Sequence, residues 1–162
     1  MTLEIVAADI GGTHARFARA TLDAAGVPVL GTVRKYKVAE FPSLAACWRA
    51  FAAEDGGPLP DRAGIAFATA ISGDTIKLTN SSWVIRPASL AQELGLAHVR
   101  LVNDFEAVAH AVARLPQGEL PLLFGNDVPF PRSGGVTVLG PGTGLGVAMI
   151  AFDEGVPHIV AT

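Results

Sequence analysis

Two glycine-rich segments of the chain, residues 8–13 and 140–144, have the composition of loops that bind phosphate groups. Glycine lets backbone N–H groups approach a phosphate closely, because no Cβ stands in the way. Either segment alone is also typical of an ordinary hairpin turn. Two of them in one chain, each directly after an apolar run, favour phosphate binding. The candidate residues are Ala8, Asp9, Ile10, Gly11, Gly12, Thr13, Gly140, Gly142, Thr143 and Gly144.

The polar residues of the first segment suit a magnesium nucleotide. The carboxylate of Asp9 is suited to hold Mg²⁺ through water, and the hydroxyl of Thr13 is a hydrogen-bond donor. Two commoner phosphate motifs are missing from the sequence, since no glycine is followed by lysine as in a Walker A loop, and the glycines of residues 140–146 lack the G-x-G-x-x-G spacing. A P-loop ATPase and a nicotinamide dehydrogenase are therefore disfavoured.

Three further polar residues are candidates for substrate chemistry. Asp104 follows the apolar run 99–102, where a carboxylate has no packing role, and it is a candidate general base. The alternative, which is compatible with that role, is a carboxylate stabilised by the dipole at a helix N-terminus. Asn103 is expected either to bind a sugar hydroxyl or to cap the same helix. Asn80 is expected either to lie in a polar turn or to face a sugar beside the ring of Trp83.

The spacing of apolar residues predicts the elements that position these side chains. Strands are indicated by β-branched and alternating runs bounded by Gly and Pro, and helices by apolar residues at i, i+3, i+4 and i+7. A helix and sheet that pack together follow from this order of elements. The predicted strands are residues 3–8, 14–22, 29–38, 63–70, a short one within 71–78, 99–102, 136–139, 145–152 and 157–161, and the predicted helices are residues 43–54, 87–94 and a segment from residue 105.

A change of composition after Arg114 predicts a domain boundary. Residues 115–133 contain Pro and Gly at short intervals. Residues 136–152 then repeat the order found at the start of the chain, which is strand, glycine-rich turn and strand. We therefore expect a small α/β domain over residues 1–114 and the start of a second, larger domain over residues 115–162.

The composition excludes several classes of protein. The 162 residues have a net charge of −3, which is too mild for a nucleic-acid or membrane-surface binder that acts through charge. Half of the residues are hydrophobic and 17% are charged, so a developed core is expected rather than disorder. The single cysteine, Cys47, and the absence of zinc-ligand spacing and of a basic signal-peptide start predict a cytoplasmic protein. The uncharged stretch 133–152 has too many glycines for a membrane helix.

Four motifs, in order and spacing, resemble the bacterial glucokinase family. The resemblance implies the fold of sugar kinases, actin and heat-shock chaperones, which has a ribonuclease H-like mixed sheet with flanking helices in each of two α/β domains. It also implies that ATP and the sugar bind between those domains. The motifs are Ala8-Asp9-Ile10-Gly11-Gly12-Thr13-His14-Ala15-Arg16-Phe17-Ala18, Thr79-Asn80-Ser81-Ser82-Trp83, Leu101-Val102-Asn103-Asp104-Phe105-Glu106-Ala107-Val108-Ala109 and Gly140-Pro141-Gly142-Thr143-Gly144-Leu145-Gly146.

The resemblance also implies roles for these residues. Asp104 would be the base that takes the proton from the glucose 6-hydroxyl as it attacks the γ-phosphate of ATP, and Asn103 and Asn80 would hold the sugar. The two glycine-rich segments would be the phosphate hairpins, with Mg²⁺ held by Asp9 through water. The expected partners are thus glucose and ATP, and neither nucleic acid nor membrane.

The chain departs from the family pattern at two positions and in length. His14 replaces an Asn that the family commonly has, and Ala70 replaces a Pro. The family's chains are about twice as long, and residue 162 lies just before the expected Glu-Gly-Gly-His sugar-binding motif. We therefore expect this polypeptide alone to be inactive and to self-associate as a dimer or larger species. A non-catalytic sugar- or nucleotide-binding regulator of the same fold and an inactive kinase fragment are the alternatives.

Overall fold

The computed structural model describes residues 3–24, 28–116, 118–126, 128–141 and 145–161. Their contacts divide the chain into two compact units, Met1–Asp104 and Phe105–Thr162. The sequence placed the boundary later, after Arg114. The physical reason for the difference is that the intervening helix packs with the second unit, where Ala109 and Ala113 share an apolar cluster with strand residues beyond residue 130.

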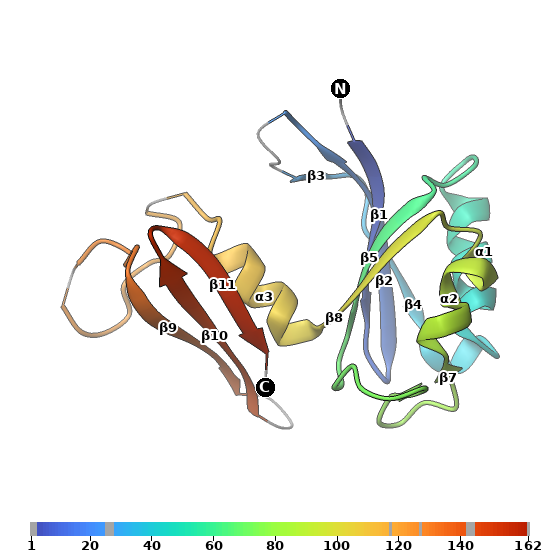
Figure 1. Ribbon diagram of the computed structural model, residues 1–162. Coiled ribbons are helices and arrows are strands. Elements are labelled where there is room, and N and C mark those ends of the chain that lie inside the picture. The colour runs from blue at the N-terminus through green and yellow to red at the C-terminus, as the bar shows by residue number, and fades with distance from the viewer. Residues whose placement is uncertain (1–2, 25–27, 117, 127, 142–144, 162) are drawn as a thin grey trace. The chain divides into compact units, whose positions relative to one another are not determined.

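The first unit is built on a mixed six-stranded sheet with the order β3-β2-β1-β5-β8, in which β4 also pairs with β2 (Figure 1). β1 and β2 are antiparallel, and β1, β5 and β8 are parallel to one another. The mixed α/β sheet predicted from the sequence is thus confirmed. The strands are β1 Leu3–Ile10, β2 His14–Leu22, β3 Pro28–Leu30, β4 Arg34–Lys37, β5 Arg62–Phe67 and β8 His98–Asn103.

The single strand predicted over residues 29–38 is wrong, because the chain forms two strands there. β3 pairs with the end of β2, and β4 pairs with its beginning. Between them, the N–H of Gly31 donates to the carbonyl of Arg19 at 2.8 Å, outside the regular ladder. A Cβ on Gly31 would lie 3.3 Å from that same oxygen, so the close approach of the two backbones favours glycine. Val38 begins a short 3-10 helix, η1 Val38–Glu40.

The strand predicted over residues 63–70 is shorter than expected. β5 ends at Phe67, although the N–H of Ala68 still donates to the carbonyl of Ile10 at 3.0 Å. Beyond it, two short strands, β6 Ile76–Lys77 and β7 Val84–Ile85, form a separate antiparallel pair. The segment that contains Asn80 joins these two strands.

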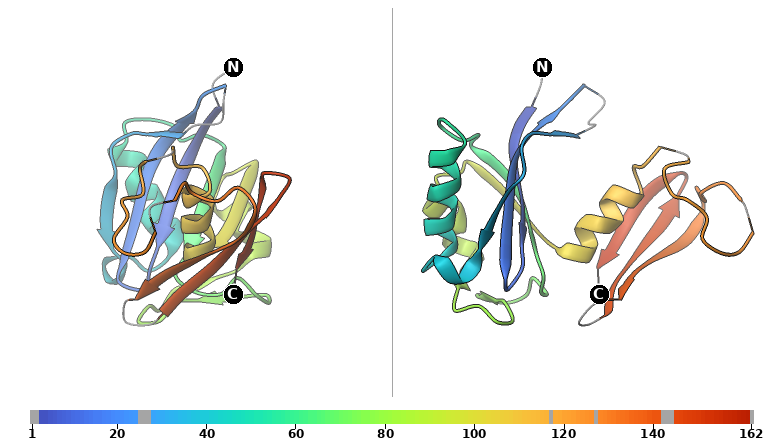
Figure 2. Two further views of the ribbon diagram at one scale, coloured as in Figure 1. Left: turned by 90° about the vertical axis from the view of Figure 1, so that its left-hand side faces the viewer. Right: turned by 180° about the vertical axis from the view of Figure 1, so that it is seen from behind.

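Two helices, α1 Leu44–Glu54 and α2 Pro87–Leu94, cover one face of this sheet (Figure 2). The hydroxyl of Ser43 caps α1 by accepting from the N–H of Ala46 at 3.2 Å, and Gly95 ends α2 in the left-handed conformation with a φ of 69°. The predicted apolar face of α1 is buried in the core, where each large side chain contributes about 1.5–3 kcal/mol. The residues of this face are Leu44, Cys47, Trp48 and Phe51.

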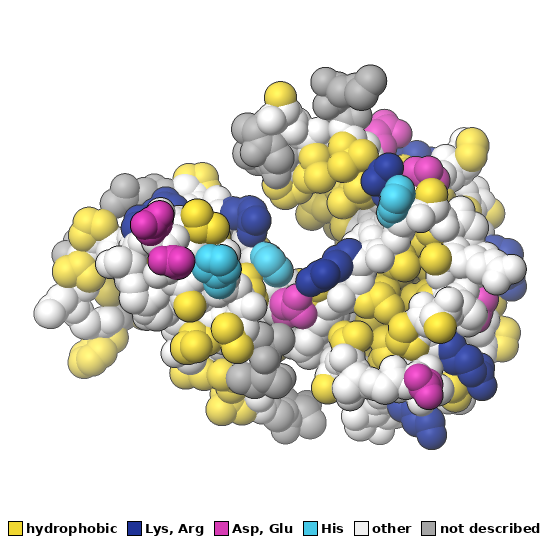
Figure 3. Space-filling view, viewed as in Figure 1, with side chains coloured by type: hydrophobic (Ala, Val, Ile, Leu, Met, Phe, Trp, Pro, Cys, Tyr) yellow, Lys and Arg dark blue, Asp and Glu magenta, His cyan; other side chains and the backbone are white. Residues whose placement is uncertain are grey.

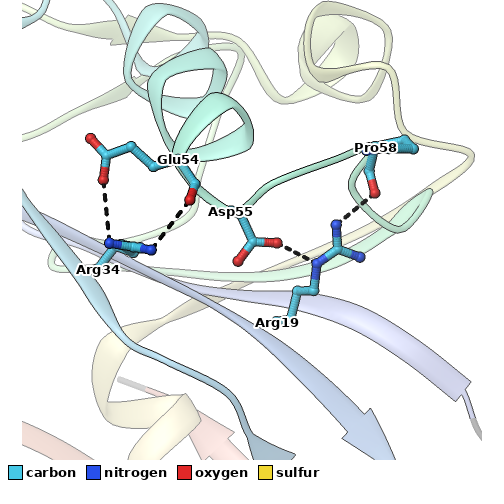
Figure 4. Close-up of polar contacts among 5 residues, drawn as sticks. All are labelled: Arg19, Arg34, Glu54, Asp55 and Pro58. Carbon is cyan, nitrogen blue, oxygen red and sulfur yellow. Dashed lines mark hydrogen bonds and ion pairs between the residues drawn. The ribbon is translucent and has the colours of Figure 1, made fainter.

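Two arginine side chains of the sheet form polar contacts with the C-terminal end of α1 and the loop after it (Figure 4). Arg19 of β2 forms an ion pair with Asp55 and donates to the carbonyl of Pro58 at 2.6 Å. Arg34 donates to the carbonyl of Glu54 at 3.2 Å. Two cations therefore lie at the C-terminus of α1, where the helix dipole favours positive charge.

The second unit has a three-stranded antiparallel sheet with the order β11-β10-β9, and α3 Asp104–Val112 packs on one face of it. The strands are β9 Gly134–Pro141, β10 Leu145–Asp153 and β11 Val156–Ala161, which confirms the three predicted here. The uncharged stretch 133–152 thus forms strands. Within the described ranges, no helix is long and apolar enough to cross a membrane.

Candidate active site

The three parallel strands of the first unit end at the same edge of the sheet. Ile10 at the end of β1 is opposite Phe67 at the end of β5, and Phe67 is opposite Asn103 at the end of β8. Ligands of open α/β sheets bind outside the carboxyl ends of parallel strands. The pairing therefore brings the first glycine-rich segment and the Asn103-Asp104 pair, which are far apart in the sequence, to one edge.

The first glycine-rich segment is a tight β1–β2 hairpin. The N–H of Gly11 donates to the carbonyl of His14 at 2.9 Å, and the carbonyl of Thr13 accepts from the N–H of Val38 at 3.0 Å. The carboxylate of Asp9 lies 2.6 Å from the guanidinium of Arg16, and both side chains are about half exposed. The turn predicted at Gly11-Gly12 is confirmed, and Asp9 stands at its rim.

Several cations share a sheet face with Asp9. Arg16 is opposite Asp9, Lys35 is opposite Arg16, and Lys37 is opposite His14, so the pleat places all of these side chains on one face. Partial burial lowers the pKa of His14, and the positive charges of Lys35, Arg16 and Lys37 lower it further. This cationic group was not predicted from the sequence, although the alternating basic residues of β4 are a signal for it. It suits an anionic ligand at the hairpin.

Gly12 brings the hairpin into contact with the segment that contains Asn80. A Cβ on Gly12 would lie 1.6 Å from the carbonyl oxygen of Thr79 and 3.8 Å from the Cβ of Asn80. Asn80 is exposed and has a φ of 63°, a conformation that asparagine tolerates better than most residues. The first glycine-rich hairpin and the candidate sugar residue Asn80 are therefore neighbours in the first unit.

The ring of Trp83, which follows the Asn80 turn in the sequence, lies in the core of the first unit. Its side chain is a core residue with 2% of its surface exposed, and its indole N–H donates to the carbonyl of Phe41 at 2.8 Å. The N–H of Trp83 also donates to the hydroxyl of Ser81 at 3.1 Å, which shapes the turn beside Asn80. The ring thus supports this turn from inside the core, because an indole buries a large apolar area once its N–H has a partner.

Asn103 and Asp104 lie where β8 becomes α3. The side-chain amide of Asn103 donates to the carbonyl of Thr69, in the loop after β5, at 3.2 Å. Asp104 is the first residue of α3 and is partly buried. A carboxylate at that position is stabilised by the helix dipole, and the bond from Asn103 ties the corner to the neighbouring strand end. A helix-start role for Asp104 and a role as a base are both consistent with this position.

The second glycine-rich segment is described only in part, since Gly142, Thr143 and Gly144 lie outside the described residues. Gly140 of β9 and Gly146 of β10 are directly opposite each other in the ladder. The ring of Phe105 lies against both, so close that a Cβ on either glycine would collide with it. Sequence reasoning missed this contact, and the recurrence of glycine on both sides of the predicted turn was the available signal.

Asp9 is the candidate magnesium residue of the first hairpin. No group of three His, Cys, Asp or Glu side chains that could hold a metal is present among the residues that the structure describes. Mg²⁺ usually keeps several waters and binds one or two carboxylates together with substrate phosphates. The half-exposed carboxylate of Asp9 at the hairpin is suited to that kind of contact.

Comparisons with known proteins agree on one family. The glucokinase of Zymomonas mobilis is 46% identical over 160 residues, which cover 99% of this chain and 49% of that protein. The glucokinase of Mesorhizobium japonicum is 38% identical, over 91% of this chain and 42% of that protein. The chain thus spans about half the length of the curated relatives it matches.

Solved structures match the fold of the chain. The crystal structure of a glucokinase from an Antarctic psychrotroph matches 98% of this chain and 49% of its own, with a TM-score of 0.83 and 29% identity. The glucokinase of Balamuthia mandrillaris in complex with glucose matches the fold, with a TM-score of 0.71 and 22% identity, over 99% of this chain and 48% of its own. The family model described as Glucokinase matches residues 6–162, and this chain therefore belongs to the glucokinase family.

Proposed function

We propose that residues 1–162 form the N-terminal half of an enzyme that transfers the γ-phosphoryl group of ATP to the 6-hydroxyl of glucose and yields glucose 6-phosphate. Family membership supports the choice of substrates. The observation that carries the proposal is the shared edge of the first sheet, where the register of β1, β5 and β8 brings the phosphate hairpin and the Asn103-Asp104 corner together.

Asp104 is the general base in this proposal. Its carboxylate accepts the proton of the attacking hydroxyl, and a fixed position at the start of α3 keeps it oriented for that step. Asn103, bonded to Thr69, and Asn80, at the turn touched by the hairpin, hold hydroxyl groups of the sugar. Positioning of this kind supplies much of the rate of phosphoryl transfer.

The first hairpin binds phosphate groups of ATP in this proposal. Backbone N–H groups at the turn and the cations Arg16, Lys35 and Lys37 offset negative charge at the first hairpin. The second glycine-rich segment contributes the further candidates Gly140, Gly142, Thr143 and Gly144, the last three of which lie outside the described residues. Asp9 would hold Mg²⁺ through water, and the ion would neutralise part of the phosphate charge.

Residues 1–162 alone are expected to be inactive, because relatives use about twice this length. Hydrophobic side chains lie on the visible surface of both units (Figure 3). Two of the most exposed, Leu123 at 94% and Phe124 at 97%, are adjacent. Exposed apolar area of this kind favours association, so we expect a homodimer or larger species in light scattering. A clean monomer that phosphorylates glucose would contradict both expectations.

The enzymatic proposal is tested in a hybrid enzyme, in which residues 1–162 are joined to the C-terminal half of the Zymomonas mobilis glucokinase. We expect ATP-dependent phosphorylation of glucose in a coupled assay. Asp104→Asn should lower kcat by about 100-fold or more and leave glucose binding unchanged. Glu106→Gln is the matched control, because it makes the same change two residues along α3, where the carboxylate lies 4.0 Å from His110.

Three results would overturn the proposal. The first is a near-normal kcat for Asp104→Asn, which would leave this carboxylate as a helix-start residue. The second is a hybrid that unfolds cooperatively, and so is folded, yet transfers no phosphate. The third is such a hybrid that binds glucose by calorimetry without turnover, which would favour the non-catalytic regulator. A hybrid with the corresponding half of the Mesorhizobium japonicum glucokinase repeats the test if the first fails to fold.

A further inference from the structure

The ring of Phe105 occupies space that two side chains would otherwise take. A Cβ on Gly140 would lie 2.1 Å from the Cζ atom of this ring, and a Cβ on Gly146 would lie 1.8 Å from its Cε2 atom. Cβ atoms in proteins essentially never approach another heavy atom within 3.0 Å. A side chain at either position would therefore force the ring to move. This packing contact is separate from any approach of the Gly140 backbone to a phosphate.

The two glycines form a platform on the face of the sheet that α3 covers. They are directly opposite each other in the β9–β10 ladder, and Gly146 lies two residues before the fully buried Ala148 on the same face. An aromatic ring laid across a glycine pair restores the packing that two missing side chains would have given. We call the pair Gly140 and Gly146 the glycine platform.

The ring belongs to the first turn of α3, and so does the proposed base. Phe105 directly follows Asp104, which begins the helix. Helix ends fray unless packing holds them, because their first N–H groups have no partner within the helix. The glycine platform provides such packing one residue away from the carboxylate.

We propose that Phe105 is a positioning residue for phosphoryl transfer, which holds the first turn of α3 on the glycine platform and so fixes the direction of the Asp104 carboxylate. This inference rests on the proposed function. A base displaced by about 1 Å costs up to about 100-fold in rate, whereas sugar binding through other residues is spared. Loss of the ring should therefore lower kcat and leave the KM for glucose unchanged.

The test uses the hybrid enzyme with Phe105→Ala and the milder Phe105→Leu. We expect kcat to fall by about tenfold to 100-fold for the first variant and less for the second, with the KM for glucose within about twofold. Phe130→Ala is the matched control, because this ring packs edge-on to Phe152 in the same unit, with centroids 6.1 Å apart. It should lower the melting temperature and leave kcat unchanged when assayed well below that temperature.

A second variant approaches the same contact from the sheet. Gly146→Ala pushes the ring off the platform and does not alter a residue assigned to phosphate binding. It should lower kcat alone, and its effect should largely disappear in a Phe105→Leu background, because both changes act on one contact. This less-than-additive result is a readout that two independent losses of stability would not give.

The outcomes separate this inference from the proposed function. One outcome is an active hybrid whose Asp104→Asn variant is inactive and whose Phe105→Ala variant is folded with a normal kcat. That outcome overturns only the positioning role of Phe105. A rise in the KM for glucose equal to the fall in kcat, or equal effects of Phe105→Ala and Phe130→Ala, would also overturn it. A folded but inactive hybrid removes the proposed function and this inference with it.

Discussion

Substitution of one glycine of the first hairpin tests whether packing, rather than phosphate approach alone, requires glycine there. Gly12→Ala places a Cβ where the carbonyl oxygen of Thr79 lies 1.6 Å away and its carbonyl carbon 2.9 Å away. The hairpin or the Thr79-Asn80 turn must then move by more than an ångström. Gly11→Ala is the matched control, because its Cβ meets only the carbonyl oxygen of His14 at 3.5 Å, an ordinary contact.

The structure sets the size of the effect. Overpacking of this kind costs about 1–3 kcal/mol, and here both colliding groups are backbone, so the upper part of that range is expected for Gly12→Ala. Gly11→Ala should change the free energy of unfolding by less than about 0.5 kcal/mol. Urea unfolding of residues 1–162, followed by circular dichroism, measures the difference between the two variants.

The same displacement has a consequence for substrate affinity in the hybrid enzyme. If phosphate approach were the only reason for Gly12, substitution would raise the KM for ATP and spare glucose. Because the turn that moves carries Asn80, we expect the KM for glucose to rise as well. Loss of one hydrogen bond worth about 1.4 kcal/mol would raise this KM by about tenfold. Equal unfolding free energies for the two alanine variants, or an unchanged KM for glucose in Gly12→Ala, would refute this reasoning.

Three further predictions concern the core of the first unit. Burial, and then the hydrogen bond and charge of Glu54, raise the pKa of Tyr36 from 10.0 to about 12. The stability that this protonated hydroxyl contributes is present below pH 10 and is lost as the pH rises towards 12. Tyr36→Phe should therefore flatten the decline of the melting temperature between pH 10 and pH 12. Burial raises the pKa of the Cys47 thiol to about 11, and a disulfide reagent at pH 8 should label it only after unfolding in urea; rapid labelling of the native chain would contradict its burial. Arg19→Met should lower the free energy of unfolding by about 1–3 kcal/mol, because it leaves the largely buried Asp55 without its cation. Lys37→Met removes an exposed ion pair and should lower the free energy of unfolding by less than about 1 kcal/mol. Equal losses in the two variants would argue against the Arg19–Asp55 contact.

The sequence was a good guide wherever a feature depends on residues close together in the chain. The apolar spacing that begins at Leu44 predicted α1, and Gly95 predicted the end of α2. The Gly11-Gly12 pair predicted the first hairpin, and the carboxylate after an apolar strand predicted that Asp104 begins a helix. These features follow from periodicity, capping and turn chemistry, which act over a few residues.

Contacts between distant residues decided the rest. The break between β3 and β4 depends on the close approach of residue 31 to Arg19, and Trp83 is a core residue because Phe41 supplies a partner for its indole N–H. Such pairings depend on the packing of the whole folded chain, so the local sequence pattern of either partner does not predict them.

The candidate site divides in the same way. The residue types alone indicated phosphate hairpins, a base and a sugar-binding amide, because glycine, carboxylate and amide groups each have a limited chemistry. Only the tertiary structure showed that Gly12 touches the turn of Asn80 and that Phe105 fills the space above Gly140 and Gly146. A missing Cβ looks the same in a sequence whether it makes room for a ligand or for another part of the chain, and only the folded backbone determines which atom takes that space.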